Sequence, residues 1–252
     1  MPRQIALLPV LLGLSVVAWF VTSQLSDPGM RVGILTGTAD SAMADAAMPI
    51  ELPLAIALFM ATWTVMMVAM MFPAVAPVVI TFDRWAQSKA RPRSVTATFI
   101  LGYLVVWSVI GLAAYAVVVV LQLLVPAGDP TAQRVGGGLL VVAGVYELTP
   151  LKNICLRHCR SPLGIIMQYA DLLAEGHRGP FRVGVVHGSY CVGCCWALML
   201  VLVLLGMMNV AWMGVVAALI FAEKVLPGGA LLSRVSGFAF IAAGAALAIG
   251  AF

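Results

Sequence analysis

Apolar runs of 18 or more residues recur along nearly the whole of this chain, and they restrict its fold more than any other feature. A run of this length with few charges is the signature of a helix that crosses the hydrocarbon core of a bilayer. The composition agrees, because 63% of the residues are hydrophobic and 10% are charged, whereas a soluble domain carries about 25% charge. The sequence therefore predicts an all-α, polytopic integral membrane helix bundle, a single transmembrane domain over residues 1–252.

The apolar runs divide into seven predicted transmembrane helices. Their expected ranges are 4–25, 51–81, 95–125, 132–151, 181–207, 210–225 and 229–251. The longest connections are 26–50, 82–94 and 152–180. In the last of these, apolar and polar residues alternate between Leu163 and Glu175, which predicts a short amphipathic helix at the inner membrane surface.

Basic residues distinguish the two sides of the predicted bundle. The connection 82–94 holds four Lys and Arg residues and the segment 152–182 holds five, whereas the opposite side holds Arg31 and Arg134 beside five acidic residues. Cytoplasmic loops carry an excess of Lys and Arg. We therefore expect 82–94 and 152–180 to be cytoplasmic and 26–50 to be external. The N-terminus is then cytoplasmic and the C-terminus external.

The predicted helix 181–207 carries three cysteines and a histidine on one face. At 3.6 residues per turn, His187, Cys191, Cys194 and Cys195 fall within an arc of about 100°. The cysteines lie about 15–21 Å from the start of the helix, near the middle of a bilayer. Thiolate and imidazole groups bind soft and borderline metals, and thiols also exchange electrons through disulfides. This face therefore predicts a metal site or a redox site.

Helix packing is the alternative interpretation of the same helix. Cysteine and glycine are small, and Gly184 and Gly188 lie four residues apart on one face. Such a pair lets a neighbouring helix approach closely. A buried histidine nevertheless needs a polar partner, which favours a functional face over packing alone.

A second cluster of thiols, Cys155 and Cys159 with His158, follows the fourth predicted helix. On a helix these three side chains share a face, and the spacing suits metal binding. We expect this cluster at the cytoplasmic surface, about one membrane half away from the cysteines of the fifth helix. A basic loop with reduced cytoplasmic thiols is the alternative.

A third set of sulfur atoms comes from the second predicted helix, where the methionines form two pairs one turn apart, Met66 with Met70 and Met67 with Met71. Thioethers are soft ligands that select Cu(I). Methionine also fills gaps in apolar cores. Together with the cysteines, the stripe favours Cu(I), with zinc as the less favoured metal.

Two pairs of charged residues lie close to apolar runs. Glu147 precedes Lys152 by little more than one turn, which predicts a local ion pair. Glu223 and Lys224 precede Pro227 and suggest an interfacial helix end with a structural role. No hydrolase, zinc-protease or phosphate-binding motif occurs, so the sequence favours a role other than enzyme catalysis. Nor does any run combine aromatic and basic residues as nucleic-acid binding requires.

Several segments between about residues 55 and 230 together resemble a bacterial family described as predicted metal-binding integral membrane proteins. The matching residues are Trp63-Thr-Val-Met66-Met67-Val-Ala-Met70-Met71 with Pro73, Leu148-Thr-Pro-Leu-Lys152 with Cys155, Cys159 and Arg160-Ser-Pro162, His187-Gly188 with Cys191-Val-Gly-Cys194-Cys195-Trp196, and Glu223-Lys224 with Pro227-Gly228. The resemblance implies metal binding within the inner membrane of a bacterium. It implies no particular substrate or mechanism.

Three hypotheses for the function follow. The first is a membrane protein that binds Cu(I) for transport, delivery or assembly of a metal cofactor, through the cysteines, histidines and methionines named above. Its partners would be the lipid bilayer and a metallochaperone or metal-requiring membrane enzyme, and an oligomer is compatible with the sequence. The second is a thiol–disulfide electron carrier between Cys191/Cys194 and Cys155/Cys159. The third is a structural or assembly protein whose cysteines only pack.

Overall fold

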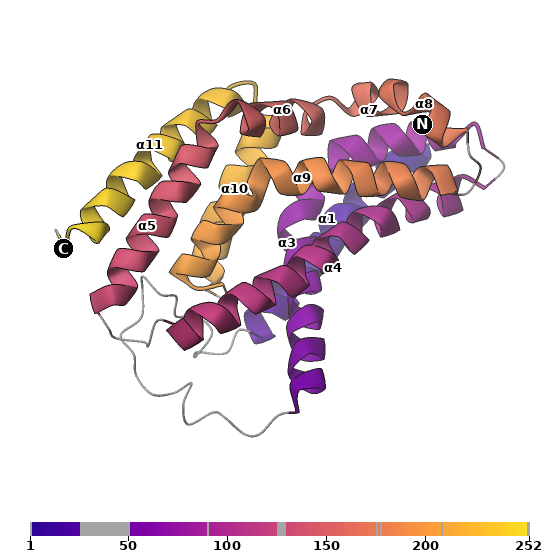
Figure 1. Cartoon of the computed structure of the whole chain (residues 1–252). Coiled ribbons are helices and arrows are strands. Elements are labelled where there is room, and N and C mark those ends of the chain that lie inside the picture. Colours follow the sequence, from indigo (N-terminus) through magenta and orange to yellow (C-terminus); the bar gives the residue numbers. More distant parts are fainter. Residues whose placement is uncertain are drawn as a thin grey trace.

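A computed structural model of the chain describes residues 2–25, 51–89, 91–124, 130–174, 176, 178–207 and 209–250. Within these residues the chain is helical and contains no strand, which confirms the all-α prediction (Figure 1). The helices are α1 (Pro2–Leu25), α3 (Leu52–Ala86), α4 (Pro92–Leu124), α5 (Pro130–Glu147), α6 (Pro150–Cys159), α7 (Pro162–Gln168), α8 (Ala170–Leu173), α9 (Arg178–Leu205), α10 (Val210–Val225) and α11 (Gly229–Ala248). Five of them begin at a proline. Proline lacks a backbone N–H, and in the first helical turn this costs nothing because N–H groups there have no partner within the helix.

Within the described residues, five helices are long and apolar enough to cross a membrane, namely α1, α3, α4, α9 and α11. A sixth span results if α5 and α6 are taken as one broken helix. At 16 residues α10 is shorter than each of these five helices. Seven spans therefore remain a prediction, and the predicted external loop 26–50 lies outside the described residues.

The fourth predicted helix ends four residues earlier than its expected limit of 151. α5 stops at Glu147, and α6 starts at Pro150 with a bend of 65° between the two. Thr149 causes this break, because its side-chain oxygen accepts a hydrogen bond of 3.3 Å from the Lys152 N–H and so caps a new helix. Proline at the first position of α6 fits the same start. The segment 152–180, predicted as a loop with one short helix, instead contains most of α6 and all of α7 and α8.

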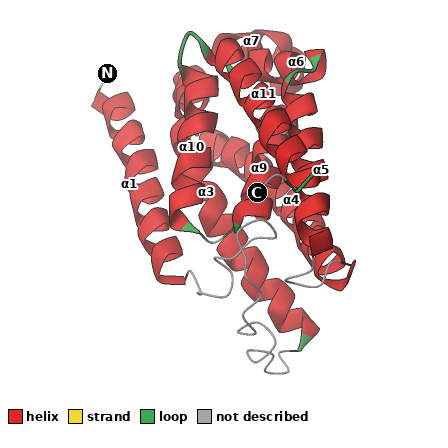
Figure 2. Cartoon of the chain, turned by 90° about the vertical axis from the view of Figure 1, so that its left-hand side faces the viewer, coloured by secondary structure: helices red, strands yellow, loops and turns green. Residues whose placement is uncertain are grey.

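Glycines bring two pairs of helices into close contact. α5 and α11 lie side by side (Figure 2), and a Cβ at Gly144 would meet the carbonyl oxygen of Gly237 across their interface. In α9, a Cβ at Gly184 would meet the Phe99 carbonyl oxygen of α4, and one at Gly188 would touch Val106. The predicted close approach at Gly184 and Gly188 is therefore confirmed, with α4 as the neighbouring helix.

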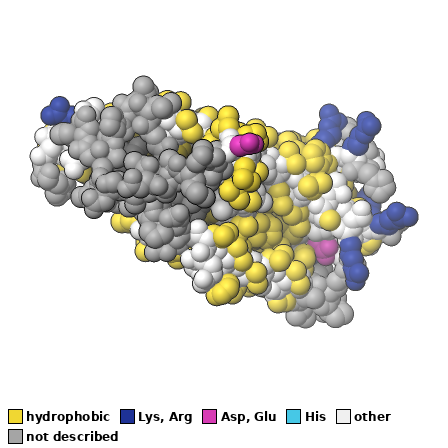
Figure 3. All heavy atoms as spheres, turned by 90° about the horizontal axis from the view of Figure 1, so that it is seen from below, with side chains coloured by type: hydrophobic (Ala, Val, Ile, Leu, Met, Phe, Trp, Pro, Cys, Tyr) yellow, Lys and Arg dark blue, Asp and Glu magenta, His cyan; other side chains and the backbone are white. Residues whose placement is uncertain are grey.

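One buried core joins side chains from α3, α4, α6, α9 and α10. All five cysteines and the four methionines of the α3 stripe belong to it. The outward faces of α1, α4 and α11 are apolar and exposed, as expected for surfaces that contact lipid. Apolar side chains cover much of the visible described surface, and the Lys and Arg side chains gather mainly at one end (Figure 3).

Candidate metal-binding site

The three cysteines of α9 lie on one buried face, as the helical spacing predicts. Cys191, Cys194 and Cys195 are each 1% exposed. The thiols of Cys194 and Cys195 both donate hydrogen bonds to the Cys191 carbonyl oxygen, at 3.1 and 2.8 Å. This local bonding turns both sulfur atoms back toward the preceding turn of α9, next to the Cys191 side chain.

Cys191 has two polar partners from other helices. Its sulfur lies 2.9 Å from the Lys224 ammonium of α10 and 3.2 Å from the Tyr103 hydroxyl of α4. Lys224 is buried, and its ammonium also lies 4.0 Å from the Met71 sulfur of α3. A lysine this close supplies a positive charge opposite a thiolate, the form of cysteine that binds metals. Cys191 is therefore the point where α3, α4, α9 and α10 meet.

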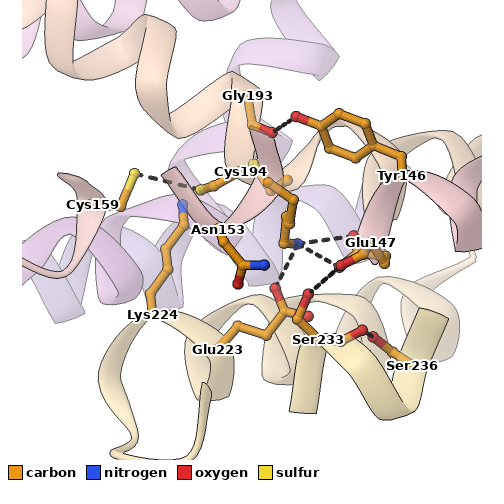
Figure 4. Close-up of polar contacts among 12 residues, drawn as sticks. Tyr146, Glu147, Asn153, Cys159, Gly193, Cys194, Glu223, Lys224, Ser233 and Ser236 are labelled. Atoms are coloured by element: carbon orange, nitrogen blue, oxygen red, sulfur yellow. Dashed lines mark hydrogen bonds and ion pairs between the residues drawn. The ribbon is translucent and has the colours of Figure 1, made fainter. Parts of the chain in front are cut away.

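Cys159 of α6 joins the same cluster. Its sulfur lies 3.4 Å from that of Cys194 (Figure 4). The sequence placed these thiols about half a membrane apart, and that expectation is wrong. The break at Thr149 explains the difference, because it turns α6 by 65° relative to α5 and lays it against α9.

Cys155, one turn before Cys159, packs on the backbone of α9. A Cβ at Gly193 would lie 2.7 Å from the Cys155 sulfur, so any larger residue there would force this thiol to shift. The Gly193 carbonyl oxygen accepts a hydrogen bond of 2.5 Å from the Tyr146 hydroxyl of α5. Both α5 and α6 are thus held against the same residue of α9.

The two candidate histidines differ in position. His187 is buried between the rings of Phe99 and Tyr103, each with its centroid 5.9 Å from the imidazole. Among the described residues its Nδ1 has no hydrogen-bond partner. His158 instead stacks on Tyr190 at 4.1 Å and bonds through Nδ1 to the Ile154 carbonyl oxygen, apart from the thiols.

The methionine stripe of α3 is buried throughout. Met66, Met67, Met70 and Met71 are each at most 1% exposed and share the core with the cysteines. Among the described contacts, Met71 is the methionine linked to the thiols, because the Lys224 ammonium contacts both its sulfur and that of Cys191. Of the sequence candidates, the structure thus brings together Cys159, Cys191, Cys194, Cys195 and Met71.

A buried ionic cluster lies beside the thiols. The Lys152 ammonium is 2.7 Å from the Glu147 carboxylate, which confirms the predicted pair, and 2.8 Å from that of Glu223. Ser233 of α11 donates a further hydrogen bond of 2.7 Å to Glu147. We expected Glu223 and Lys224 at an interfacial helix end; both side chains are instead buried within the bundle.

Sequence reasoning missed the roles of Lys224 and Tyr103. Lys224 carried a signal, since a charged residue at the end of an apolar helix is costly unless it has a buried partner. Tyr103 carried none that distinguishes it from the other aromatic residues of its apolar run.

The donor set suits a soft metal ion. Thiolates and thioethers select Cu(I), and the buried Nδ1 of His187 offers a further donor. Within the described ranges, no three His, Cys, Asp or Glu side chains form a ready-made coordination group. The described sulfur–sulfur contact joins two of the donors, Cys159 and Cys194.

Fold and site together define an all-helical bundle that has several helices long enough to span a membrane and a buried cluster of soft donors. A family model described as "PpoB2: Copper chaperone" matches residues 60–247, well over half of the chain. The chain belongs to this copper chaperone family. Comparisons with curated proteins and with solved structures each found no match.

Proposed function

We propose that this protein is an integral membrane copper chaperone that binds Cu(I) with the thiols of α6 and α9 and delivers it to a second protein. The ligands would come from Cys159, Cys191, Cys194 and Cys195, with Met71 and His187 nearby and Cys155 at the edge of the cluster. Delivery requires a partner, for which a metallochaperone or a metal-requiring membrane enzyme is the expected class. By the charge rule, the basic segments 82–94 and 152–180 would be cytoplasmic, and Cys155 and Cys159 would then lie nearest that side.

The contact between Cys159 and Cys194 carries this proposal. Two helices distant in sequence bring their sulfur atoms within 3.4 Å of one another, among further buried thiols. Packing alone does not require five cysteines in one core, whereas soft-metal binding does require several sulfur donors in reach of one ion. Membership of the copper chaperone family supports copper as the metal that these sulfur donors would bind.

The Cys191→Ser/Cys194→Ser double variant tests the proposal. Serine keeps a polar acceptor for Lys224 but removes the soft donor, so the fold should persist while Cu(I) binding is lost. We expect the apparent Cu(I) affinity, measured by competition with bicinchoninate, to fall by more than about 100-fold. Loss of a residue that only supports a metal ligand typically costs about 10- to 100-fold, and loss of two ligands should cost more.

Met213→Leu is the matched control, because it removes a buried sulfur about 16 Å along α10 from Lys224. It should retain copper as the unsubstituted protein does. Unchanged copper affinity in the folded double variant would overturn the proposal.

Thiol–disulfide exchange is the second candidate function, and the same contact supports it. The sequence suggested Cys191 with Cys194 as one pair, but the Cys194 thiol points to the Cys191 carbonyl oxygen and its sulfur neighbour is Cys159. A carrier would lose Cys159 and Cys194 together on mild oxidation and regain both on reduction. Peptide mapping that finds either thiol oxidised without the other would rule this function out.

A further inference from the structure

Glu223 of α10 makes two separate contacts with α6. Its carboxylate lies 2.8 Å from the Lys152 ammonium. Its backbone carbonyl oxygen accepts a hydrogen bond of 2.6 Å from the Arg160 guanidinium. In Figure 4, Glu223, Glu147 and Ser233 converge on the same cluster of contacts, beside Lys224 and Cys159.

The two contacts hold opposite ends of α6. Lys152 lies in the first turn of the helix, and Arg160 is the residue that follows its last. Between them, Cys155, Leu156 and Cys159 form with Lys152 a buried stripe at the spacing of one helix face. Whatever fixes both ends of α6 therefore also fixes where the Cys159 thiol lies relative to α9.

The Arg160 contact leaves little freedom for movement. A Cβ at Gly229, the first residue of α11, would collide with both the Glu223 carbonyl oxygen and the Arg160 guanidinium. Side chains at Lys152 and Glu223 are at most 2% exposed, so water does not compete for their ion pair. Loss of the Glu223 carboxylate would leave Lys152 paired with Glu147 of α5, so α6 would keep its ion pair to α5 and lose the one to α10.

We propose that Glu223 is a positioning residue that holds α6 against α9 and so keeps Cys159 next to Cys194. Its importance for copper rests on the proposed function, but its effect on the two thiols does not. Glu223 touches no sulfur atom in any described contact. Its carboxylate acts through Lys152, and its backbone carbonyl oxygen acts through Arg160. The same short segment of α10 therefore places Lys224 at Cys191 and Cys159 at Cys194.

The test is the rate at which diamide joins Cys159 to Cys194 in the full-length, copper-free protein in detergent. The two thiols become a disulfide, and diamide takes up their two electrons and two protons. Peptide mapping by mass spectrometry quantifies the cross-linked pair. We expect Glu223→Gln to slow its formation about fivefold or more.

Glu147→Gln is the matched control. It removes an equal charge from Lys152 but leaves both contacts between α6 and α10, so the cross-linking rate should stay near that of the unsubstituted protein. A role limited to stability predicts instead that both glutamine variants behave alike.

Arg160→Gln provides a second route if Glu223→Gln does not fold, because it breaks only the contact at the other end of α6. It should slow cross-linking as well. Unchanged cross-linking in a folded Glu223→Gln or Arg160→Gln variant would overturn the proposal, as would equal slowing by Glu147→Gln. Absence of copper binding in the unsubstituted protein would refute the proposed function. It would not affect the cross-linking result, which is measured without copper.

Discussion

Cys191 and Lys224 form the most consequential contact at the scale of single residues. Both are buried, and their polar atoms are 2.9 Å apart. Replacing a buried charge pair with apolar groups of similar volume costs little, whereas removing one partner leaves an uncompensated charge. Because Lys224 is buried beside it, the side chain at position 191 should therefore affect the free energy of unfolding of the bundle.

Cys191→Ala is predicted to lower the free energy of unfolding by about 3–5 kcal/mol, because the Lys224 ammonium loses its nearest partner. Cys191→Ser should be milder, since its hydroxyl still accepts a hydrogen bond from Lys224. Chemical unfolding in detergent, followed by circular dichroism, measures both changes.

Lys224→Met in the Cys191→Ala background is the control for this interpretation. Methionine replaces the ammonium with an apolar chain of similar length, so the double variant should regain most of the lost stability. A double variant less stable than Cys191→Ala alone would contradict the role assigned to the pair.

At the scale of helices, the face of α9 was predictable because helical spacing alone places His187, Cys191, Cys194 and Cys195 together. The position of α6 was not. Nothing in the sequence around Thr149 shows whether the chain runs along the membrane surface or folds back against α9. That choice depends on the contact of Lys152 with Glu223, 71 residues further along the chain, and on the contact of Cys155 with Gly193.

Close packing of α4 and α9 gives a prediction at the same scale. Gly184→Ala should lower the free energy of unfolding by about 1–3 kcal/mol, because its Cβ would press on the Phe99 backbone and push α4 away. The shift should also weaken the contact of Tyr103 with Cys191. Thermal unfolding of the detergent-solubilised protein reports the loss of stability.

Gly138→Ala is the matched control on α5, since a Cβ there meets no atom within 4 Å. Alanine also favours a helix more than glycine does. This variant should be as stable as the unsubstituted protein or slightly more so. Equal destabilisation by both substitutions would show that the α4–α9 contact is not the cause.

At the scale of the whole molecule, the charged residues and the helix contacts indicate one orientation. The turn between α10 and α11 lies near Arg160, whose guanidinium bonds to Glu223, and Arg234 is exposed just beyond it. We therefore predict that this turn lies on the same side as the basic segments 82–94 and 152–180, which the charge rule predicts to be cytoplasmic. α9 and α10 would cross in opposite directions.

The last prediction is that the N-terminus is cytoplasmic and the C-terminus external. α10 decides the outcome for the C-terminus, because its 16 residues rise only about 24 Å against a hydrocarbon core of about 30 Å. Reporters active only inside or only outside the cytoplasm, fused to each terminus, would measure it, and an insertion in the segment 82–94 should report the cytoplasm as a control. A cytoplasmic C-terminus would mean that α10 does not cross. Lys224 would then approach the thiols of α9 from the side on which α10 enters.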